Sequence, residues 1–360
     1  MFHPAPTVSQ STAVAYSHKL PQLISLVNRR LLDRPDLAML IGSNPTSVML
    51  GNHENHGRFL ASWFQVAQTG LLRQTMRWAV DSYSNRGFAA AYFTVELEAW
   101  IEAITEQIEE PARSELVALY RWMLDQLAEP EQNPAQDDET VSGPLVWTEE
   151  QEKLLSFLLA GDHRAALALT REQLNRQAAL SAIYLDLLQP VLYQVGLLWQ
   201  QGRISVAHEH LATSIVLRIM ASLYEHFPQT DRVKGKFVIA SPTGEQHEIG
   251  ARMIADLLEL DGWQVLYMGA NTPVEDLINL LIAEKPLALG LSVTMSYNLG
   301  QLADTLARIR SVESLAGLRI LAGGHALQSL EQTPDWLQAV DALPRDAAGL
   351  LRVADSWSVS

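Results

Sequence analysis

Residues 236–250 read KFVIASPTGEQHEIG, and this stretch decides the fold of the C-terminal half. A short apolar run is followed by a polar loop with Pro and Gly, and a helical period then continues to about residue 260, which is typical of a buried strand, a loop and a helix. The runs WQVLYMG (263–269), LALGLSV (287–293) and LRILAGG (318–324) repeat the strand pattern. Helical stretches separate them, so residues 231–360 are predicted to form a doubly wound, mostly parallel sheet with helices on both faces.

The loops after the four predicted strands follow Ser241, Gly269, Ser292 and Gly323. Ligands of open parallel sheets bind beyond the carboxyl ends of the strands. We therefore expect these loops to share one rim and to carry the binding site.

The N-terminal half has a different pattern. Apolar residues recur at helical spacing from about residue 19 to 127, with breaks near 42–45, 51–57 and 85–87, which predicts an all-helical domain of five or six helices over residues 1–128. Residues 129–147 are acidic and polar, as expected of a linker. Over 148–230, a capping box and three further helical stretches joined by short breaks predict a four-helix bundle.

The composition narrows the function classes. The chain has 360 residues, no cysteine and a formal net charge of -15. Disulfides and thiolate metal sites are excluded, so any metal is held by histidine, carboxylates or a cofactor's own ring. The negative charge argues against direct DNA binding, which depends on Lys and Arg. Without a basic and apolar leader or an uninterrupted apolar run of about 18 residues, we expect a cytoplasmic protein that does not enter a membrane.

The rim contains a histidine motif, Glu245-x-His247-x-x-Gly250. It resembles the Asp-x-His-x-x-Gly signature of cobalamin-binding domains, in which the histidine replaces the lower base of the cofactor. The resemblance implies that His247 is the lower axial ligand of cobalt. A ligating histidine needs a neutral nitrogen toward the metal and a carboxylate on its other nitrogen, and Glu245 suits that role. Gly250 would let the nucleotide tail approach the helix backbone.

Two later motifs fall on the same rim. Ser292 and Thr294 follow the third predicted strand, and Gly323-Gly324 follow the fourth. Taken alone the glycine pair is typical of a plain turn. In the order found here, these residues are similar to the cobalamin-domain motifs that surround the buried nucleotide tail, and the resemblance implies a flavodoxin-like cobalamin-binding domain.

The predicted bundle carries a further motif, in which Trp199 is followed after nine residues by Glu209-His210. A short helical hairpin brings the three side chains to one end of the bundle. The spacing resembles the Trp-x9-Glu-His cap of the CarH-type cobalamin-dependent photoreceptor family. There the tryptophan covers the upper face of the corrin and the Glu-His pair contacts the upper axial group, often adenosyl. The resemblance covers about residues 148–355 and implies cobalamin as cofactor, with adenosylcobalamin favoured.

Two features depart from that family. The position after the cap tryptophan, where a histidine can ligate cobalt after illumination, is Gln200, so His208 and His210 are the alternatives. The basic winged-helix DNA reader of the family's regulators is replaced by the helical domain, which contains four tryptophans. We therefore expect action through a regulator or effector protein without direct DNA binding, with a homo-oligomer as a further expectation.

The N-terminal domain offers a second hypothesis. Residues 81–100 contain several aromatic side chains and Arg86, and His53 and His56 lie upstream. Aromatic rings could sandwich a planar tetrapyrrole, Arg86 could pair with a propionate, and a histidine could face the pyrrole nitrogens or an iron. A bilin such as biliverdin would be bound without a covalent link, because the chain has no cysteine. The alternative is that these are ordinary core and helix-end residues.

The sequence thus favours a light sensor or signalling regulator over an enzyme. Photolysis of the upper axial ligand would shift the cap and expose a partner surface. A corrinoid methyl-carrier protein of a methyltransferase system and a haem or redox sensor on the same fold are the alternatives.

Overall fold

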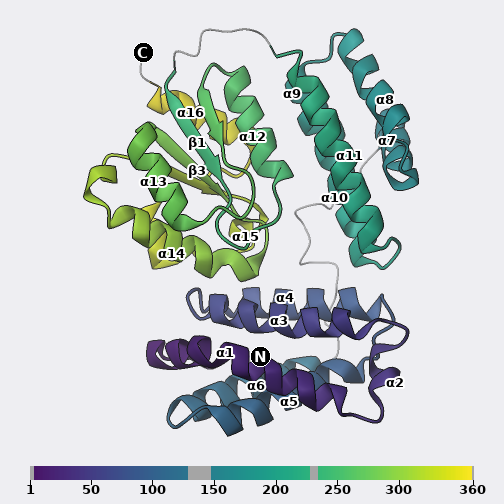
Figure 1. Cartoon of the computed structure of the whole chain (residues 1–360), viewed down its shortest axis with the longest axis vertical. Coiled ribbons are helices and arrows are strands. Elements are labelled where there is room, and N and C mark those ends of the chain that lie inside the picture. The colour runs from purple at the N-terminus through teal and green to yellow at the C-terminus, as the bar shows by residue number, and fades with distance from the viewer. Residues whose placement is uncertain (1–3, 129–146, 228–233, 359–360) are drawn as a thin grey trace.

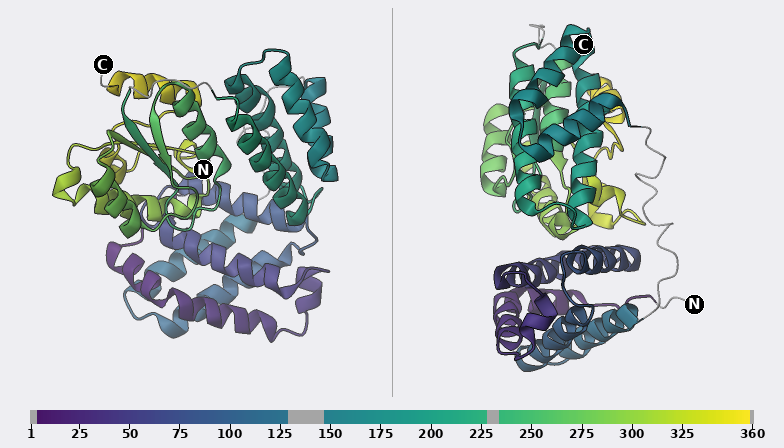
Figure 2. Two further views of the ribbon diagram at one scale, coloured as in Figure 1. Left: turned by 45° about the horizontal axis from the view of Figure 1, so that its top comes forward. Right: turned by 90° about the vertical axis from the view of Figure 1, so that its right-hand side faces the viewer.

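The computed structural model describes residues 4–128, 147–227 and 234–358. A helical cap and an α/β domain stand side by side, and the N-terminal helical domain lies across the end of both (Figures 1 and 2). The predicted fold class, helical domains followed by a parallel-sheet α/β domain, is confirmed. All but the last residue of the predicted linker, 129–147, lies outside the described residues.

The N-terminal domain is entirely helical over its described residues. The predicted break at 51–57 is wrong, because one helix runs through it. Its Gly57 lies so close to the first helix that an added Cβ would meet Leu20 Cδ1 at 2.6 Å. Gly57, one of the residues that suggested a break, thus serves close helix packing. The helices are α1 (Gln10–Leu32), α2 (Leu37–Ile41), α3 (Thr46–Trp63), α4 (Thr69–Ser84), α5 (Ala91–Gln107) and α6 (Ala112–Ala128).

The cap is a bundle of four helical runs. The predicted capping box is present, with Thr148 Oγ1 accepting from Gln151 N and Gln151 Oε1 accepting from Thr148 N. The first run ends at Gly161, whose φ of 72° favours glycine. The runs are α7 (Glu149–Ala160), α8 (His163–Asn175), a continuous run of α9 (Leu180–Ala182), a π-helical segment (Ile183–Leu188) and α10 (Gln189–Gln200), and α11 (Val206–Tyr224).

The π-helical segment has a local cause in Pro190. Proline has no N–H to donate to the carbonyl four residues earlier, that of Asp186. The Asp186 carbonyl instead accepts a hydrogen bond of 2.7 Å from Gln151 Nε2, on the neighbouring helix α7. The capping-box glutamine thus also ties α7 to the long cap helix.

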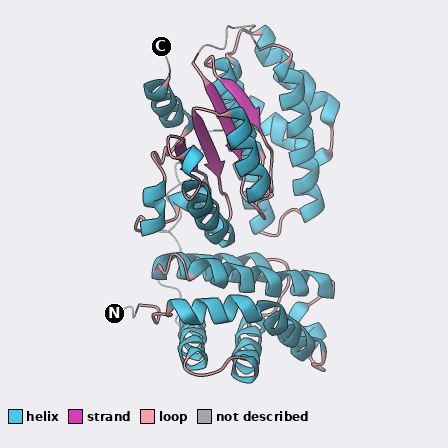
Figure 3. Ribbon diagram, turned by 60° about the vertical axis from the view of Figure 1, so that its left-hand side comes forward, coloured by secondary structure: helices cyan, strands magenta, loops and turns pink. Residues whose placement is uncertain are grey.

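The α/β domain is a four-stranded parallel sheet in the order β2-β1-β3-β4 over the described residues (Figure 3). Alternate side chains of β1 point to opposite faces: Val238 packs with α13 and α14, whereas Ile239 packs with α12 and α16. The order reverses between β1 and β3, which places the topological switch point there. The elements are β1 (Lys236–Ala240), α12 (Ile249–Leu260), β2 (Gln264–Tyr267), α13 (Val274–Glu284), β3 (Ala288–Ser292), α14 (Leu299–Arg310), β4 (Arg319–Gly323), α15 (His325–Gln328) and α16 (Ala347–Trp357), with short 3-10 turns at Ser296–Asn298, Glu313–Leu315 and Asp335–Ala339.

The N-terminal domain docks on the α/β domain through polar contacts as well as apolar ones. Ser62 Oγ on α3 accepts a hydrogen bond of 2.5 Å from Gly300 N at the start of α14. Gln68 Oε1 accepts from the backbone N–H of Glu331 at 2.8 Å and also from that of Gln332. Buried apolar side chains of both domains form one continuous cluster. The two domains therefore share a core.

One helical run among the described residues, Leu180–Gln200, is long and apolar enough to cross a membrane by length and composition alone. Only a third of its most apolar window is buried inside the protein. Several of its apolar residues, among them Leu192, Tyr193 and Leu197, line the central cavity described below. The apolar side chains of this run that are not buried in the bundle thus include ones that face the cavity.

Candidate functional site

A cavity of about 2140 Å³ lies where the cap, the α/β domain and the N-terminal domain meet. We call it the central cavity. It is larger than the roughly 300–1,000 Å³ typical of small-molecule pockets. Residues from α10 and α11, from the loops after β1, β3 and β4, and from α3 and α4 line it. A large, extended ligand fits its dimensions.

His247 lies in the α/β wall of the cavity, and Glu245 lies behind it. Both belong to the loop after β1, at the switch point of the sheet. The His247 side chain is 51% exposed, whereas that of Glu245 is fully buried behind it. His247 Nδ1 donates a hydrogen bond of 2.6 Å to Glu245 Oε1. Since this bond fixes the Nδ1–H tautomer, Nε2 is the nitrogen available to a metal.

The other carboxylate oxygen of Glu245 is held by the loop after β3. Glu245 Oε2 accepts hydrogen bonds from Thr294 N at 2.9 Å, Met295 N at 3.0 Å and Asn298 Nδ2 at 3.0 Å. Burial alone would raise the pKa of Glu245, but the bonds from His247 and Met295 outweigh it and lower the pKa to about 2. The carboxylate is therefore a fixed negative charge that braces the imidazole.

The electrostatics of His247 follow from this partner. Burial lowers the pKa of the imidazole, but the hydrogen bond and charge of Glu245, with a smaller contribution from Glu209 across the cavity, raise it overall. A more basic imidazole is a better electron donor to a bound metal. Within the described residues, no hydrogen bond engages His247 Nε2.

The remaining rim residues line the same cavity as His247. Ser292, Thr294, Gly323 and Gly324 all line the cavity. Gly324 has a φ of 111°, and an added Cβ would meet the Val293 carbonyl oxygen at 2.2 Å, so only glycine fits. At Gly250 an added Cβ would meet no atom within 4 Å, and it would project into open space. The start of α12 thus offers bare backbone to a ligand.

Trp199 forms the cap wall at the end of α10. The Arg86 guanidinium carbon lies 3.9 Å from the centroid of the Trp199 ring, and Arg86 Nη2 donates a hydrogen bond of 3.0 Å to the Trp199 carbonyl. Trp78 packs on the same ring with centroids 6.1 Å apart. Both contacts come from α4 and the loop after it. The N-terminal domain therefore holds the cap tryptophan in place.

Glu209 and His210 lie on the first turns of α11. His210 Nδ1 donates a hydrogen bond of 2.6 Å to Glu209 Oε2, and Thr213 Oγ1 donates one of 3.0 Å to Glu209 Oε1. His210 therefore has the same fixed tautomer as His247, each through a glutamate. Two imidazoles with available Nε2 atoms thus line one cavity from opposite walls.

Nine of the ten predicted site residues line the central cavity, and Glu245 lies directly behind it. Gln200 and His208 line it as well, and His208 Nδ1 is engaged with Ser205 Oγ at 2.7 Å. Sequence reasoning missed Trp78, Thr213 and Asn298. Thr213 lies one turn after Glu209 and was recognisable from helical spacing, whereas Asn298 is 53 residues from its partner.

The three residues chosen for a tetrapyrrole site are engaged otherwise. Arg86 packs on Trp199. His53 is fully buried, with Nδ1 at 2.5 Å from Asn28 Oδ1 and Nε2 at 3.1 Å from the Tyr92 hydroxyl. His56 lines the cavity but bonds to Tyr120. These contacts give the bilin hypothesis no support.

Comparison with known proteins agrees with this geometry. Residues 150–224 and 235–343 each match a family model described as a B12 binding domain. The HTH-type transcriptional repressor CarH of Myxococcus xanthus is 34% identical over 144 residues, which are 40% of this chain and 47% of the repressor. Dimethylamine corrinoid protein 3 of Methanosarcina acetivorans is 22% identical over 132 residues, which are 36% of this chain and 62% of that protein. The chain thus spans less than two thirds of either relative.

A solved structure supports the fold. The monomethylamine corrinoid protein of Methanosarcina barkeri superimposes with a TM-score of 0.51 at 18% identity, covering 58% of this chain and 98% of that chain. The residues present also fit a corrinoid: one braced imidazole, bare glycine backbone beside it and a cavity large enough for a macrocycle. The C-terminal half of this chain, with its two matched B12 binding domains, belongs to the cobalamin-binding proteins.

Proposed function

We propose that this protein is a cobalamin-binding light sensor that signals through a protein partner. The observation that supports the proposal best is that Trp199 and the Glu209-His210 pair line the same cavity as His247. The likeness to the repressor CarH favours a regulator. Adenosylcobalamin is the favoured form, because the cap motif resembles that of the light-sensing family.

The roles of the residues follow from their contacts. When bound, cobalamin would supply a light-sensitive cobalt–carbon bond. His247 would hold the lower face through Nε2, and Glu245 keeps that imidazole in its ligating tautomer. Ser292, Thr294 and the rim glycines would surround the nucleotide tail. Trp199 would cover the upper face, beside Glu209 and His210.

The signal would leave the site through Trp199. Its ring is packed between the cavity and the Arg86 and Trp78 side chains. A change in a group bound next to the ring would shift the free energy of these contacts, and with it the docking of α4 on the cap. The cap and the N-terminal domain would then form a two-state element with a partner surface that differs between states.

The partner is proposed to be a protein rather than DNA. The formal charge of -15 opposes binding to phosphates. A gel-shift titration with random duplex DNA at two salt concentrations tests this, and we expect no complex in the dark or after light. A tight, salt-sensitive complex would mean that this chain reads DNA itself. Sizing by light scattering in both states tests self-association.

The alternative function is a corrinoid methyl carrier, which the likeness to corrinoid proteins supports. A carrier must open the upper face of its cobalt to a separate methyltransferase. Here α3 and α4 line the cavity beside the cap, and Arg86 holds Trp199. The N-terminal domain thus adds a wall to the cavity on the side of the cap, where a carrier would have to open, and this favours the sensor.

The deciding experiment is a pair of absorption spectra of the full chain with adenosylcobalamin, recorded in the dark and after green light. We expect a spectral change on illumination and an accompanying change in size or shape by small-angle scattering. Photolysis without any such change would favour the carrier. Absence of cobalamin binding would overturn both functions.

A further inference from the structure

Residues 294–300 lie between the Glu245–His247 pair and the N-terminal domain. We call them the support loop: it follows β3, contains the 3-10 turn Ser296–Asn298 and ends in the first turn of α14. On one side, three donors of the loop hold Glu245 Oε2, namely Thr294 N, Met295 N and Asn298 Nδ2. Hydrogen bonds weaken steeply with distance and angle. A carboxylate oxygen shared by three donors therefore requires the loop to keep one geometry.

On its other side the support loop contacts α3, which lies in the layer of the N-terminal domain that faces the α/β domain (Figure 1). Ser62 Oγ accepts a hydrogen bond of 2.5 Å from Gly300 N and donates one of 3.4 Å to the Ser296 carbonyl. One hydroxyl can do both, because it carries a donor and two acceptor sites. Ser62 is buried, and an added Cβ at Gly300 would lie 3.2 Å from Ser62 Cα. The hydroxyl thus joins the 3-10 turn to the start of α14 at a close contact between the domains.

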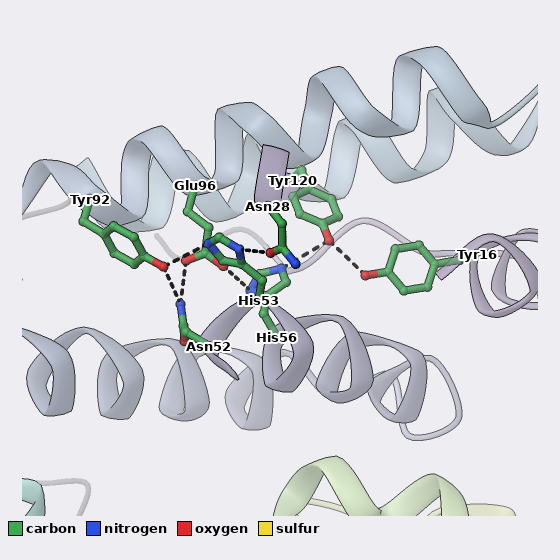
Figure 4. A network of polar contacts seen from close by, with 8 residues as sticks. All are labelled: Tyr16, Asn28, Asn52, His53, His56, Tyr92, Glu96 and Tyr120. Atoms are coloured by element: carbon green, nitrogen blue, oxygen red, sulfur yellow. Dashed lines mark hydrogen bonds and ion pairs between the residues drawn. The ribbon is translucent and has the colours of Figure 1, made fainter. Parts of the chain in front are cut away.

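The opposite face of α3 is fixed inside the N-terminal domain by a buried polar network (Figure 4). His53 Nδ1 lies 2.5 Å from Asn28 Oδ1 on α1, and His53 Nε2 lies 3.1 Å from the Tyr92 hydroxyl on α5. A further bond of the network reaches α6. Ser62 follows His53 by about two and a half helical turns, so the two side chains leave α3 on opposite faces. Since α3 cannot shift against α1 and α5 without breaking buried hydrogen bonds, it carries the position of the N-terminal domain to the support loop.

We propose that Ser62 is a positioning residue for the Glu245–His247 pair. It holds the support loop in the geometry that directs its donors at Glu245 Oε2, and Glu245 in turn fixes the tautomer and orientation of the His247 ring. The N-terminal domain therefore acts on two walls of the central cavity, on the α/β wall through Ser62 and on the cap wall through Arg86. The consequence for cobalt rests on the proposed ligation by His247.

A second polar contact between the same two domains provides the matched control. Gln68 Oε1 accepts from the backbone N–H groups of Glu331 and Gln332, in the segment after α15. Within the described residues, this segment makes no hydrogen bond to Glu245 or to the support loop. Loss of the Gln68 contacts therefore weakens the docking but leaves the support of Glu245 intact. Substitutions at Ser62 and Gln68 thus separate positioning from docking in general.

The test follows the Nδ1–H proton of His247 by nuclear magnetic resonance in the full chain without cobalamin. Its signal is identified by its absence in His247→Asn, and its exchange with water reports how firmly Glu245 holds the ring. We expect Ser62→Ala to speed this exchange about tenfold, as the loss of one hydrogen bond to the support loop allows. Gln68→Ala should leave the exchange rate unchanged.

An absorption titration with cobalamin then measures the consequence at the metal. Ser62→Ala acts one contact further away than a substitution of Glu245 itself, so it should weaken binding by a smaller factor, about threefold. It should also increase the fraction of bound cobalamin whose spectrum lacks histidine ligation, and Gln68→Ala should match the wild type in both measurements. Wild-type affinity and spectrum in Ser62→Ala would overturn the consequence for cobalt.

Two results would overturn the positioning role: an unchanged exchange rate of the His247 proton in Ser62→Ala, or an equal acceleration in Gln68→Ala, which would make the effect one of docking in general. Circular dichroism and the melting temperature of each variant show whether it is folded. If Ser62→Ala does not fold, Gly300→Ala replaces it, because the added methyl group pushes Ser62 away from the support loop and should speed the exchange likewise. Because the exchange measurement contains no cobalamin, it decides the positioning role even if the proposed light sensing fails.

Discussion

Replacing Arg86 by alanine should loosen the hairpin between α10 and α11 without unfolding the protein. The substitution removes a cation–π contact with Trp199, about 1–2 kcal/mol when partly buried, and a hydrogen bond to the Trp199 carbonyl, about 1 kcal/mol or more. Arg86 is partly buried, so we discount the sum to about 2 kcal/mol. The bonds of Ser62 and Gln68 to the α/β domain stay in place and keep the domains docked.

The assay is amide hydrogen exchange in residues 198–206. Gly202 N donates to the Trp199 carbonyl and Arg203 N to the Leu198 carbonyl, so these two amides report opening of the hairpin. A loss of about 2 kcal/mol corresponds to about thirtyfold faster exchange. The exchange rates of Arg86→Lys should lie between those of the wild type and of Arg86→Ala, because lysine keeps the charge but not the planar contact. Arg121→Ala, at an exposed position of α6, should leave the exchange rates unchanged. Unchanged exchange in Arg86→Ala would refute the proposed hold on Trp199.

The remaining predictions concern residues of the central cavity and the contact between the cap and the α/β domain. His247→Ala should remove the spectral signature of histidine ligation, and Glu245→Gln should weaken cobalamin binding about tenfold or more, both read from absorption titrations in which unchanged curves would contradict the assignment. Trp199→Ala should still bind cobalamin but change its photolysis rate, and equal rates would leave the tryptophan a purely structural role. Asp256 accepts a hydrogen bond of 2.7 Å from the Tyr184 hydroxyl, and burial raises its pKa to about 6. Its contribution to stability is thus fully present below about pH 4 and is lost as the pH rises to about 6. Asp256→Asn should therefore be more resistant to urea than the wild type at pH 7.5 by on the order of 2–3 kcal/mol, with a smaller difference at pH 4.5, and an equal difference at both would refute it.

The fold of the C-terminal half was predictable because its signals are local. Each strand is one short apolar run between turn residues, and the capping box at Thr148 lies within four residues. The break expected at 51–57 was wrong for a physical reason: the glycine and histidine that interrupt the apolar pattern there are buried against other helices. Tertiary packing, which one sequence does not display, overrides local preference at such sites.

The candidate site was predictable only in part. The side chains that face the cavity follow from motif spacing, because the loops of a parallel sheet meet at one rim. Their supports come from far along the chain: Glu245 is held by amides 49 to 53 residues later, and Trp199 by an arginine 113 residues earlier. From the sequence alone, the guanidinium group of Arg86 suited a role as partner of a tetrapyrrole propionate as well as a role in packing on Trp199. Only the docking of the N-terminal domain distinguishes the two roles.

A coupling between cofactor binding and that docking must act in both directions. If the bound cofactor favours the cap position in which Trp199 packs against Arg86, then the N-terminal domain in turn favours the bound cofactor by the same factor. A contact of about 2 kcal/mol limits this coupling to about thirtyfold. Arg86→Ala should therefore weaken dark-state cobalamin binding by at most that factor and leave the affinity of the illuminated state nearly unchanged, although Arg86 belongs to neither matched B12 binding domain. Equal weakening in both states would mean that the arginine supports the pocket but does not report its state.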